Sequence, residues 1–147
     1  MSHIPLINSL LQNELSAVAA YQQALNKFRK QTALGEMDVL MSSFEEHKAA
    51  VSNLQGKIQQ LGGVAVQDSG AWGAWAKIFM AGAILLGKQA ALKALREGEL
   101  TGFEEYEKVL QDHELPSDIR ALIETKLLPA QQRHMRTLDS LLVAVMA

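Results

Sequence analysis

The chain has 147 residues, a formal net charge of −2 and no cysteine. The absence of cysteine excludes disulfides, a thiolate nucleophile and any cysteine-ligated zinc or iron–sulfur site. The low net charge and the lack of a basic cluster argue against nucleic acid as a partner, because binding to phosphates needs grouped lysines and arginines.

The size of the chain and its segments indicate one soluble domain. A chain of this length buries a substantial core, so we expect a single bundle domain over residues 1–147. The N-terminus lacks the basic start and apolar core of a signal peptide. The most apolar segment, residues 71–86, carries Lys77 and is shorter than the ~20 residues that cross a bilayer. We therefore expect a cytoplasmic protein without stable membrane insertion.

Two helices are predicted for the first half of the chain. Apolar residues at spacings of three and four predict a helix over about residues 2–31, and a second helix that follows Gly35 and ends near Leu61. Gly62 and Gly63 fit the left-handed conformation that commonly ends a helix. The predicted inward positions are Ile7, Leu11, Val18, Leu25 and Phe28, then Leu40, Phe44, Val51, Leu54, Ile58 and Leu61.

The second half predicts another helical pair behind a long connection. The apolar segment is expected to be helical and to bend at Gly87, before a third long helix over about residues 88–113. Pro116 fits the first turn of a fourth helix that runs to about Val145, and Pro129 is expected to kink that helix. Two hairpins joined by a longer crossover predict an all-α four-helix bundle.

A short internal repeat places polar residues on all four apolar stripes. The two copies are Glu14, Tyr21 and His47 in the first half and Glu99, Tyr106 and His134 in the second. The tyrosine follows the glutamate by seven residues in both copies, and the histidine follows it by 33 and 35 residues. An unpaired charge on a buried stripe is costly, so we expect these side chains to meet inside the bundle.

Two interpretations of this polar group remain open. Carboxylate oxygens and imidazole nitrogens suit iron, manganese or zinc, and two carboxylates balance one divalent ion. The candidate metal ligands are Glu14, His47, Glu99 and His134, with Tyr21 and Tyr106 as hydrogen-bond partners of the carboxylates. In the other interpretation, the same residues form buried ion pairs and hydrogen bonds without a metal. The acidic pair Glu45 and Glu46 is expected to face solvent.

The paired Glu and Tyr positions resemble those of the ferritin-like superfamily, within it the rubrerythrin-like and small uncharacterised bacterial branches. Its members carry a lone Glu on helices one and three and a Glu-x-x-His on helices two and four, often with a Tyr two turns after the lone Glu. The resemblance covers most of the chain in architecture but only a handful of residues in its motifs. It implies a ferritin-like four-helix bundle.

The chain departs from that pattern at both Glu-x-x-His motifs. Three residues before the two histidines stand Phe44 and Gln131, and three residues after them stand Ala50 and Thr137. Both carboxylates that would bridge two iron ions are therefore missing. We expect a mononuclear site, with Gln131 as a fifth candidate ligand, or a remnant of a site without metal. Full ferroxidase activity is not expected.

The leading functional hypothesis is a non-haem metal-binding bundle protein. The alternative is a metal-free structural or stress-related interaction protein that retains the bundle, and a metal-dependent oxidoreductase is a third, weaker option. No catalytic residue is identified, since the spacing of Ser and His indicates no triad. We expect a homo-oligomer, most simply a dimer, through residues 71–86, with Trp72 and Trp75 as anchors.

Overall fold

The computed structural model describes residues 3–31 and 34–146, and over them the chain is helical with no strand. The side chains of residues 31, 71, 72, 74, 75, 78 and 146 lie outside this description. The helices are α1 (Ile4–Phe28), α2 (Leu34–Gln60), α3 (Gly70–Leu86), α4 (Lys88–Val109), α5 (Ser117–Leu122) and α6 (Leu128–Met146). A 3-10 turn, Arg29–Gln31, follows α1, and a π-helical segment, Ile123–Leu127, connects α5 to α6.

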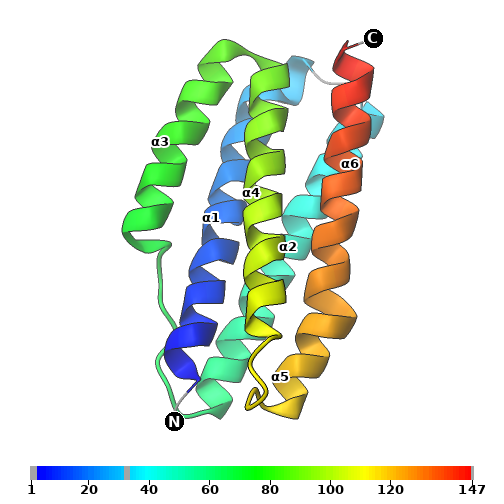
Figure 1. Cartoon of the computed structure of the whole chain (residues 1–147). Coiled ribbons are helices and arrows are strands. Elements are labelled where there is room, and N and C mark those ends of the chain that lie inside the picture. Colours follow the sequence, from blue (N-terminus) through cyan, green and yellow to red (C-terminus); the bar gives the residue numbers. More distant parts are fainter. Residues whose placement is uncertain (1–2, 32–33, 147) are drawn as a thin grey trace.

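The four long helices α1, α2, α4 and α6 form a bundle of two antiparallel hairpins (Figure 1). α1 packs against α2, and α4 packs against α6. α2 and α4 run in the same direction in Figure 1, so the connection between them must cross the length of the bundle. The predicted all-α bundle with one crossover is confirmed.

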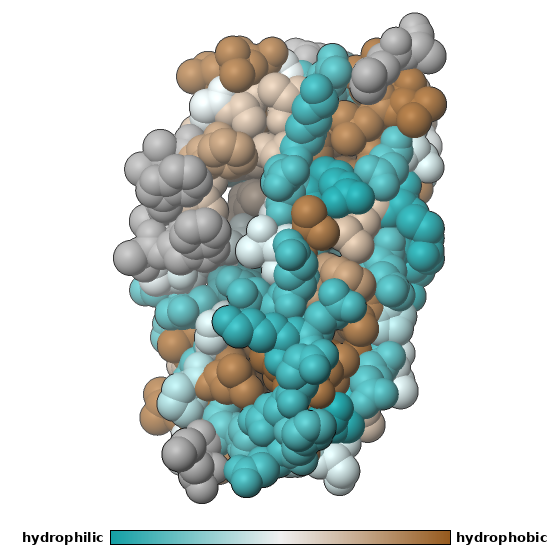
Figure 2. All heavy atoms as spheres, in the orientation of Figure 1, coloured by the Kyte–Doolittle hydropathy of each residue, from teal (hydrophilic) through white to brown (hydrophobic). Residues whose placement is uncertain are grey.

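The crossover consists of residues 61–69 and the helix α3, which packs against α1 and α4. Gly87 then reverses the chain, with a φ of +115° that residues with side chains rarely adopt. The bend expected here is therefore a full reversal of direction. Leu85 and Leu86 at this turn are 85% and 82% exposed, and Figure 2 shows hydrophobic surface at the top of the view, where α3 meets α4.

Two hydrophobic clusters fill the bundle, one toward each end. The first includes Ile7, Leu11, Leu54, Ile58, Val109 and Ile123, and the second includes Leu25, Phe44, Leu92, Leu95 and Leu138. Most of the predicted inward positions are buried, but Leu61 lies beyond the end of α2 and is 42% exposed. The charged residues of the repeat lie between the two clusters, along the sequence and along the bundle.

The π-helical segment keeps one face of the fourth bundle helix inward. Around this segment the buried residues recur at a strict spacing of four, at Ile119, Ile123, Leu127 and Gln131. On an α-helix of 3.6 residues per turn, residues four apart point in directions that differ by about 40°, so the buried face would drift around the helix. A wider π turn compensates for this drift. Leu128 donates its N–H to the carbonyl of Ile123, five residues back. The irregularity expected from Pro129 takes the form of this π turn.

None of the helices over the described residues is long and apolar enough to span a membrane.

Candidate metal centre

The polar residues of the repeat meet in one buried layer between the two hydrophobic clusters. Each of the four long helices contributes one of them: α1 carries Glu14, α2 His47, α4 Glu99 and α6 His134. Their exposed fractions are 4%, 1%, 2% and 2%, and Gln131 is exposed by 3%. The structure therefore brings together every residue that the sequence analysis proposed as a ligand.

His47 lies at the centre of this layer, between the two carboxylates of the repeat. Its Nδ1 is 2.6 Å from Oε2 of Glu14, and its Nε2 is 2.7 Å from Oε1 of Glu99. The first contact is a hydrogen bond in which the imidazole N–H donates to the carboxylate. One ring thus joins the α1 carboxylate to the α4 carboxylate.

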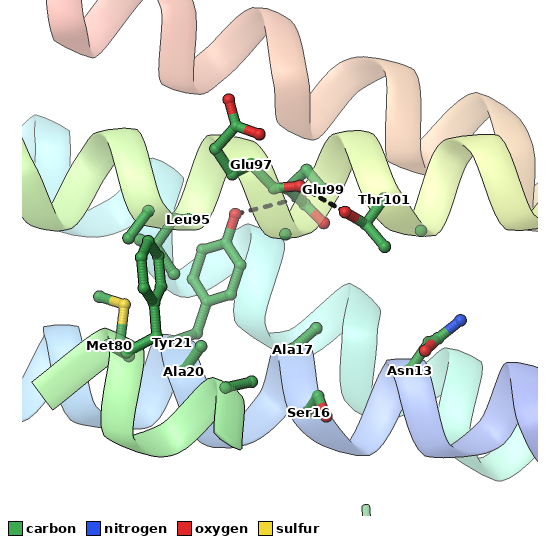
Figure 3. A pocket seen from close by; sticks show the side chains of 15 residues that line it. Asn13, Ser16, Ala17, Ala20, Tyr21, Met80, Leu95, Glu97, Glu99 and Thr101 are labelled. Carbon is green, nitrogen blue, oxygen red and sulfur yellow. Dashed lines mark hydrogen bonds between the residues drawn. The ribbon is translucent and has the colours of Figure 1, made fainter. Parts of the chain in front are cut away.

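The tyrosines bind the glutamates of the opposite copy of the repeat. Tyr106 donates to Glu14 at 2.6 Å. Tyr21 donates to Glu99 at 3.1 Å, and Figure 3 shows this second contact. Seven residues span about 10 Å along a helix, so neither tyrosine reaches the glutamate of its own helix. Because α1 and α4 run antiparallel, each tyrosine instead lies level with the other helix's glutamate.

His134 breaks the symmetry of the layer. Its Nδ1 is 2.8 Å from Oε2 of Glu99, and its Nε2 is 3.2 Å from Oε1 of Glu46. Glu46 also pairs with Arg133. The expectation that Glu46 faces solvent is therefore wrong in part, since its side chain is 35% exposed and completes the layer on the α2–α6 side.

The sequence holds a signal for Glu46 that periodicity alone missed. The residues that immediately precede the two histidines are Glu46 and Arg133, which have opposite charge and occupy equivalent places in the repeat. A repeat that brings the two histidines together also brings their preceding residues together. The long side chain of Glu46 then reaches inward from the edge of the helix face.

Gln131 holds Glu99 by two hydrogen bonds. Its Nε2 donates to the Glu99 carbonyl oxygen at 2.9 Å and to Oε1 of the same residue at 3.1 Å. Gly102 makes room for this amide, because a Cβ at position 102 would stand 2.4 Å from the Gln131 nitrogen.

We expect Gly102→Ala to lower the free energy of unfolding by about 1–3 kcal/mol, since the added methyl group displaces the Gln131 amide from Glu99. Gly98→Ala, one turn earlier in α4, is the matched control because a Cβ there meets nothing within 4 Å. Alanine should stabilise that site by up to about 1 kcal/mol through its helix propensity. Urea unfolding measures both, and stabilisation by both substitutions would contradict the role given to Gln131.

The layer shifts the pKa values of its own residues. Burial opposes the charge on His47, but the carboxylates of Glu99 and Glu14 outweigh it and raise the pKa of the imidazole to about 10. Burial likewise opposes ionisation of Glu99, but His47 and His134 lower the pKa of that carboxyl group to about 2. Burial, followed by the charge of Glu99, raises the pKa of Tyr21 well above its ordinary value.

Three of these side chains present ligand atoms to one point. One atom each from His47, Glu99 and His134 lies within 4.8 Å of the other two. Nε2 of His47 and Nδ1 of His134 lie close to Glu99 oxygens, yet neither nitrogen has a hydrogen-bond partner in suitable geometry. Neighbouring ligands about 2.1 Å from an ion lie about 3 Å apart and point at the ion rather than at each other. The residues therefore fit a metal ion.

Comparisons with known proteins agree with this architecture. A family model described as "Domain of unknown function (DUF2383)" matches residues 3–112. A crystal structure titled as ferritin-like, diiron-carboxylate proteins from Bacillus anthracis str. Ames is similar at a TM-score of 0.73 and 21% identity, covering 97% of this chain and 99% of that one. A search of curated proteins found no match. The chain has the ferritin-like fold and belongs to the DUF2383 family.

Proposed function

We propose that this chain is a metal-binding ferritin-like protein with one divalent ion per bundle. The ligands are Nε2 of His47, a carboxylate oxygen of Glu99 and Nδ1 of His134. Two imidazoles and one carboxylate are a common ligand set for iron and zinc, and manganese also accepts it. The observation that carries the proposal is the pair of buried ring nitrogens that converge on Glu99 without hydrogen bonds of their own.

The other nitrogen of each ring has a carboxylate partner, which supports the proposal. Glu14 accepts the Nδ1 hydrogen bond of His47, and Glu46 lies against Nε2 of His134. Metal-binding histidines commonly donate their second N–H to such a partner, which fixes the orientation of the ring. Glu14 therefore acts on the ion through His47 in this proposal, although the sequence analysis suggested it as a direct ligand.

One ion fits this chain better than two. The similar crystal structure is titled as a diiron-carboxylate protein. In this chain the positions three residues before the histidines hold Phe44 and Gln131 in place of carboxylates. Phe44 offers no ligand, and Gln131 uses its amide nitrogen to hold Glu99. Two closely spaced cations would lack the bridging carboxylates that offset their charge, so we do not propose full ferroxidase activity.

A metal-free bundle protein with a structural or stress-related role is the second candidate. The contacts of His47 favour it, because an imidazolium between Glu14 and Glu99 neutralises one of the two buried carboxylates without any ion. The two candidates differ in what fills the space between Glu99 and the two rings: a proton in the second, a metal ion in the first.

Metal analysis by mass spectrometry tests the proposal. Protein purified without a His tag is loaded anaerobically with Fe(II), Mn(II) or Zn(II), and we expect about one ion per chain for at least one of them. His47→Gln with His134→Gln should remove it, whereas the control His3→Gln with His113→Gln, which changes the other two histidines, should not. A wild-type protein that stays empty with all three ions contradicts the metal proposal and leaves the metal-free one.

We also propose a homodimer through residues 71–86. Phe79, Leu85 and Leu86 are all at least 49% exposed, while the side chains of Trp72 and Trp75 lie outside the described residues. Leu85→Ser with Leu86→Ser should halve the mass measured by light scattering, because it removes apolar surface from the contact.

The control for this prediction is Val143→Ser, since Val143 is 69% exposed on α6, and α6 lies on the opposite side of the bundle from α3 in Figure 1. A wild-type mass of one chain, or a dimer that survives the double substitution, contradicts the interface.

A further inference from the structure

A cavity of about 270 Å³ lies between α1, α3 and α4, next to the candidate metal centre (Figure 3). Small residues on three helices open it: Ala17, Ala20, Ala76, Ala94, Gly98 and Gly102. Tyr21 and Glu99, both members of the polar layer, form part of its wall. In Figure 3 the phenol of Tyr21 points across to Glu99, so the cavity ends against the polar layer.

The wall of this cavity selects a neutral and mainly apolar occupant. Phe79, Met80 and Leu95 line it together with the small residues. Its charged wall residues are Glu97 and Glu99, and no lysine or arginine among the described residues lines it, so an anion is disfavoured. A dry cavity of about 150 Å³ holds benzene, so this volume suits a molecule of about ten non-hydrogen atoms.

The two ends of the cavity differ in polarity. In Figure 3 Ser16 and Asn13 lie toward one end of the cavity, and Met80 and Leu95 toward the other. The Ser16 hydroxyl is buried near Gly73 of α3, so it does not face the open space. A molecule with a mainly apolar surface therefore matches most of the wall.

A second cavity on the opposite side of the layer has a different character. It has about 320 Å³, and its lining includes Glu46 of α2, Lys126 of the π-helical segment and Arg133 of α6. Charged walls of both signs suit water and small ions. The two cavities thus give the layer one hydrophilic side and one apolar side. Only the apolar cavity, between α1, α3 and α4, suits an organic ligand.

We propose that the cavity between α1, α3 and α4 binds a small neutral organic molecule with a mainly apolar surface, such as an alkylated phenol. Binding itself needs no metal ion. The role of such a molecule as a substrate or effector of the Glu99 site rests on the proposed metal centre.

Thymol, a neutral phenol of suitable size, is the probe, and the methyl resonance of Met80 reports on binding in metal-free protein. We expect thymol to shift that resonance with a dissociation constant below about 1 mM, while the methyl of Met41 on α2 stays in place. Cumate, an anion of similar size, should bind at least tenfold more weakly.

Two variants place the probe in this cavity. Ala17→Leu fills the space and should weaken thymol at least tenfold, whereas the same change at Ala49, in the wall of the polar cavity, should not.

Two results would overturn this site: a Met80 resonance that thymol leaves unmoved, or an Ala17→Leu protein that binds thymol as the wild type does. If Ala17→Leu fails to fold by circular dichroism, Ala20→Leu replaces it. Because all measurements use metal-free protein, their failure leaves the metal proposal standing, and an empty metal site leaves this proposal standing.

Discussion

Glu99→Gln should lower metal affinity at least 100-fold, the largest single loss we expect in this protein. Glu99 is the carboxylate that both ring nitrogens approach, at 2.7 and 2.8 Å. The amide keeps the size of the side chain but removes the anionic ligand and one of the charges that balance the ion. Glu14→Gln should cost less, about 10–100-fold, because it acts only through the orientation of His47.

The same variant also separates the two candidate functions. Without metal, Glu99→Gln should destabilise the fold by about 3–5 kcal/mol, because His47 then keeps only one of its two carboxylate partners. A metal-binding wild type gains stability with added ion, by about 2.7 kcal/mol at an ion concentration of 100 times Kd, and the variant should show no such gain.

Isothermal titration for Kd and thermal unfolding with and without metal measure both effects. Glu97→Gln, the same change at an exposed position two residues away on α4, is the control and should behave as the wild type. Unchanged metal affinity in Glu99→Gln would remove this residue from the ligand set.

The bundle and the members of its polar layer were predictable from sequence because both follow from helix periodicity. A polar residue at a stripe position must lie inside once the stripe packs, so Glu14, His47, Glu99 and His134 meet. The internal repeat strengthened this inference, since two hairpins of similar pattern that pack together bring equivalent positions to one level.

The partners within the layer were not predictable from periodicity. An apolar stripe shows which side of its helix a residue occupies, but not how two helices are shifted along their axes relative to each other. That shift places Tyr21 beside Glu99 rather than Glu14. The inward reach of Glu46 depends on a rotamer at the edge of the helix face, which periodicity does not specify. The π turn before Pro129 sets the direction in which Gln131 points. Its presence depends on how far the buried face has rotated around the helix over several turns.

The stability of the metal-free protein should fall as the pH rises from about 6.5 toward 10. The folded-state pKa of His47 is raised from 6.5 to about 10, so its contribution is complete below 6.5 and is lost as the ring deprotonates. Glu99 behaves in the opposite way: its pKa is lowered from 4.5 to about 2, so its contribution is complete above 4.5 and is lost in acid. These two residues stabilise the fold most between about pH 4.5 and 6.5.

Urea unfolding in the presence of a chelator measures this slope between pH 6 and 9. One proton corresponds to at most about 1.4 kcal/mol per pH unit, and the slope of the wild type should exceed that of His47→Gln by up to this amount. His113→Gln, which changes an exposed histidine, should keep the slope of the wild type. Equal slopes in the wild type and in His47→Gln would mean that His47 is neutral in the folded protein.

Metal binding should depend on pH in the opposite direction. An ion at Nε2 of His47 must displace the proton that the nearby Glu99 carboxylate favours on that nitrogen, so metal affinity should rise about tenfold per pH unit across the same range. The fold of the metal-free protein is therefore least stable at the pH values where metal affinity is highest. A protein whose only function is structural would show only the decrease of stability with pH. Added Fe(II), Mn(II) or Zn(II) would leave that decrease unchanged.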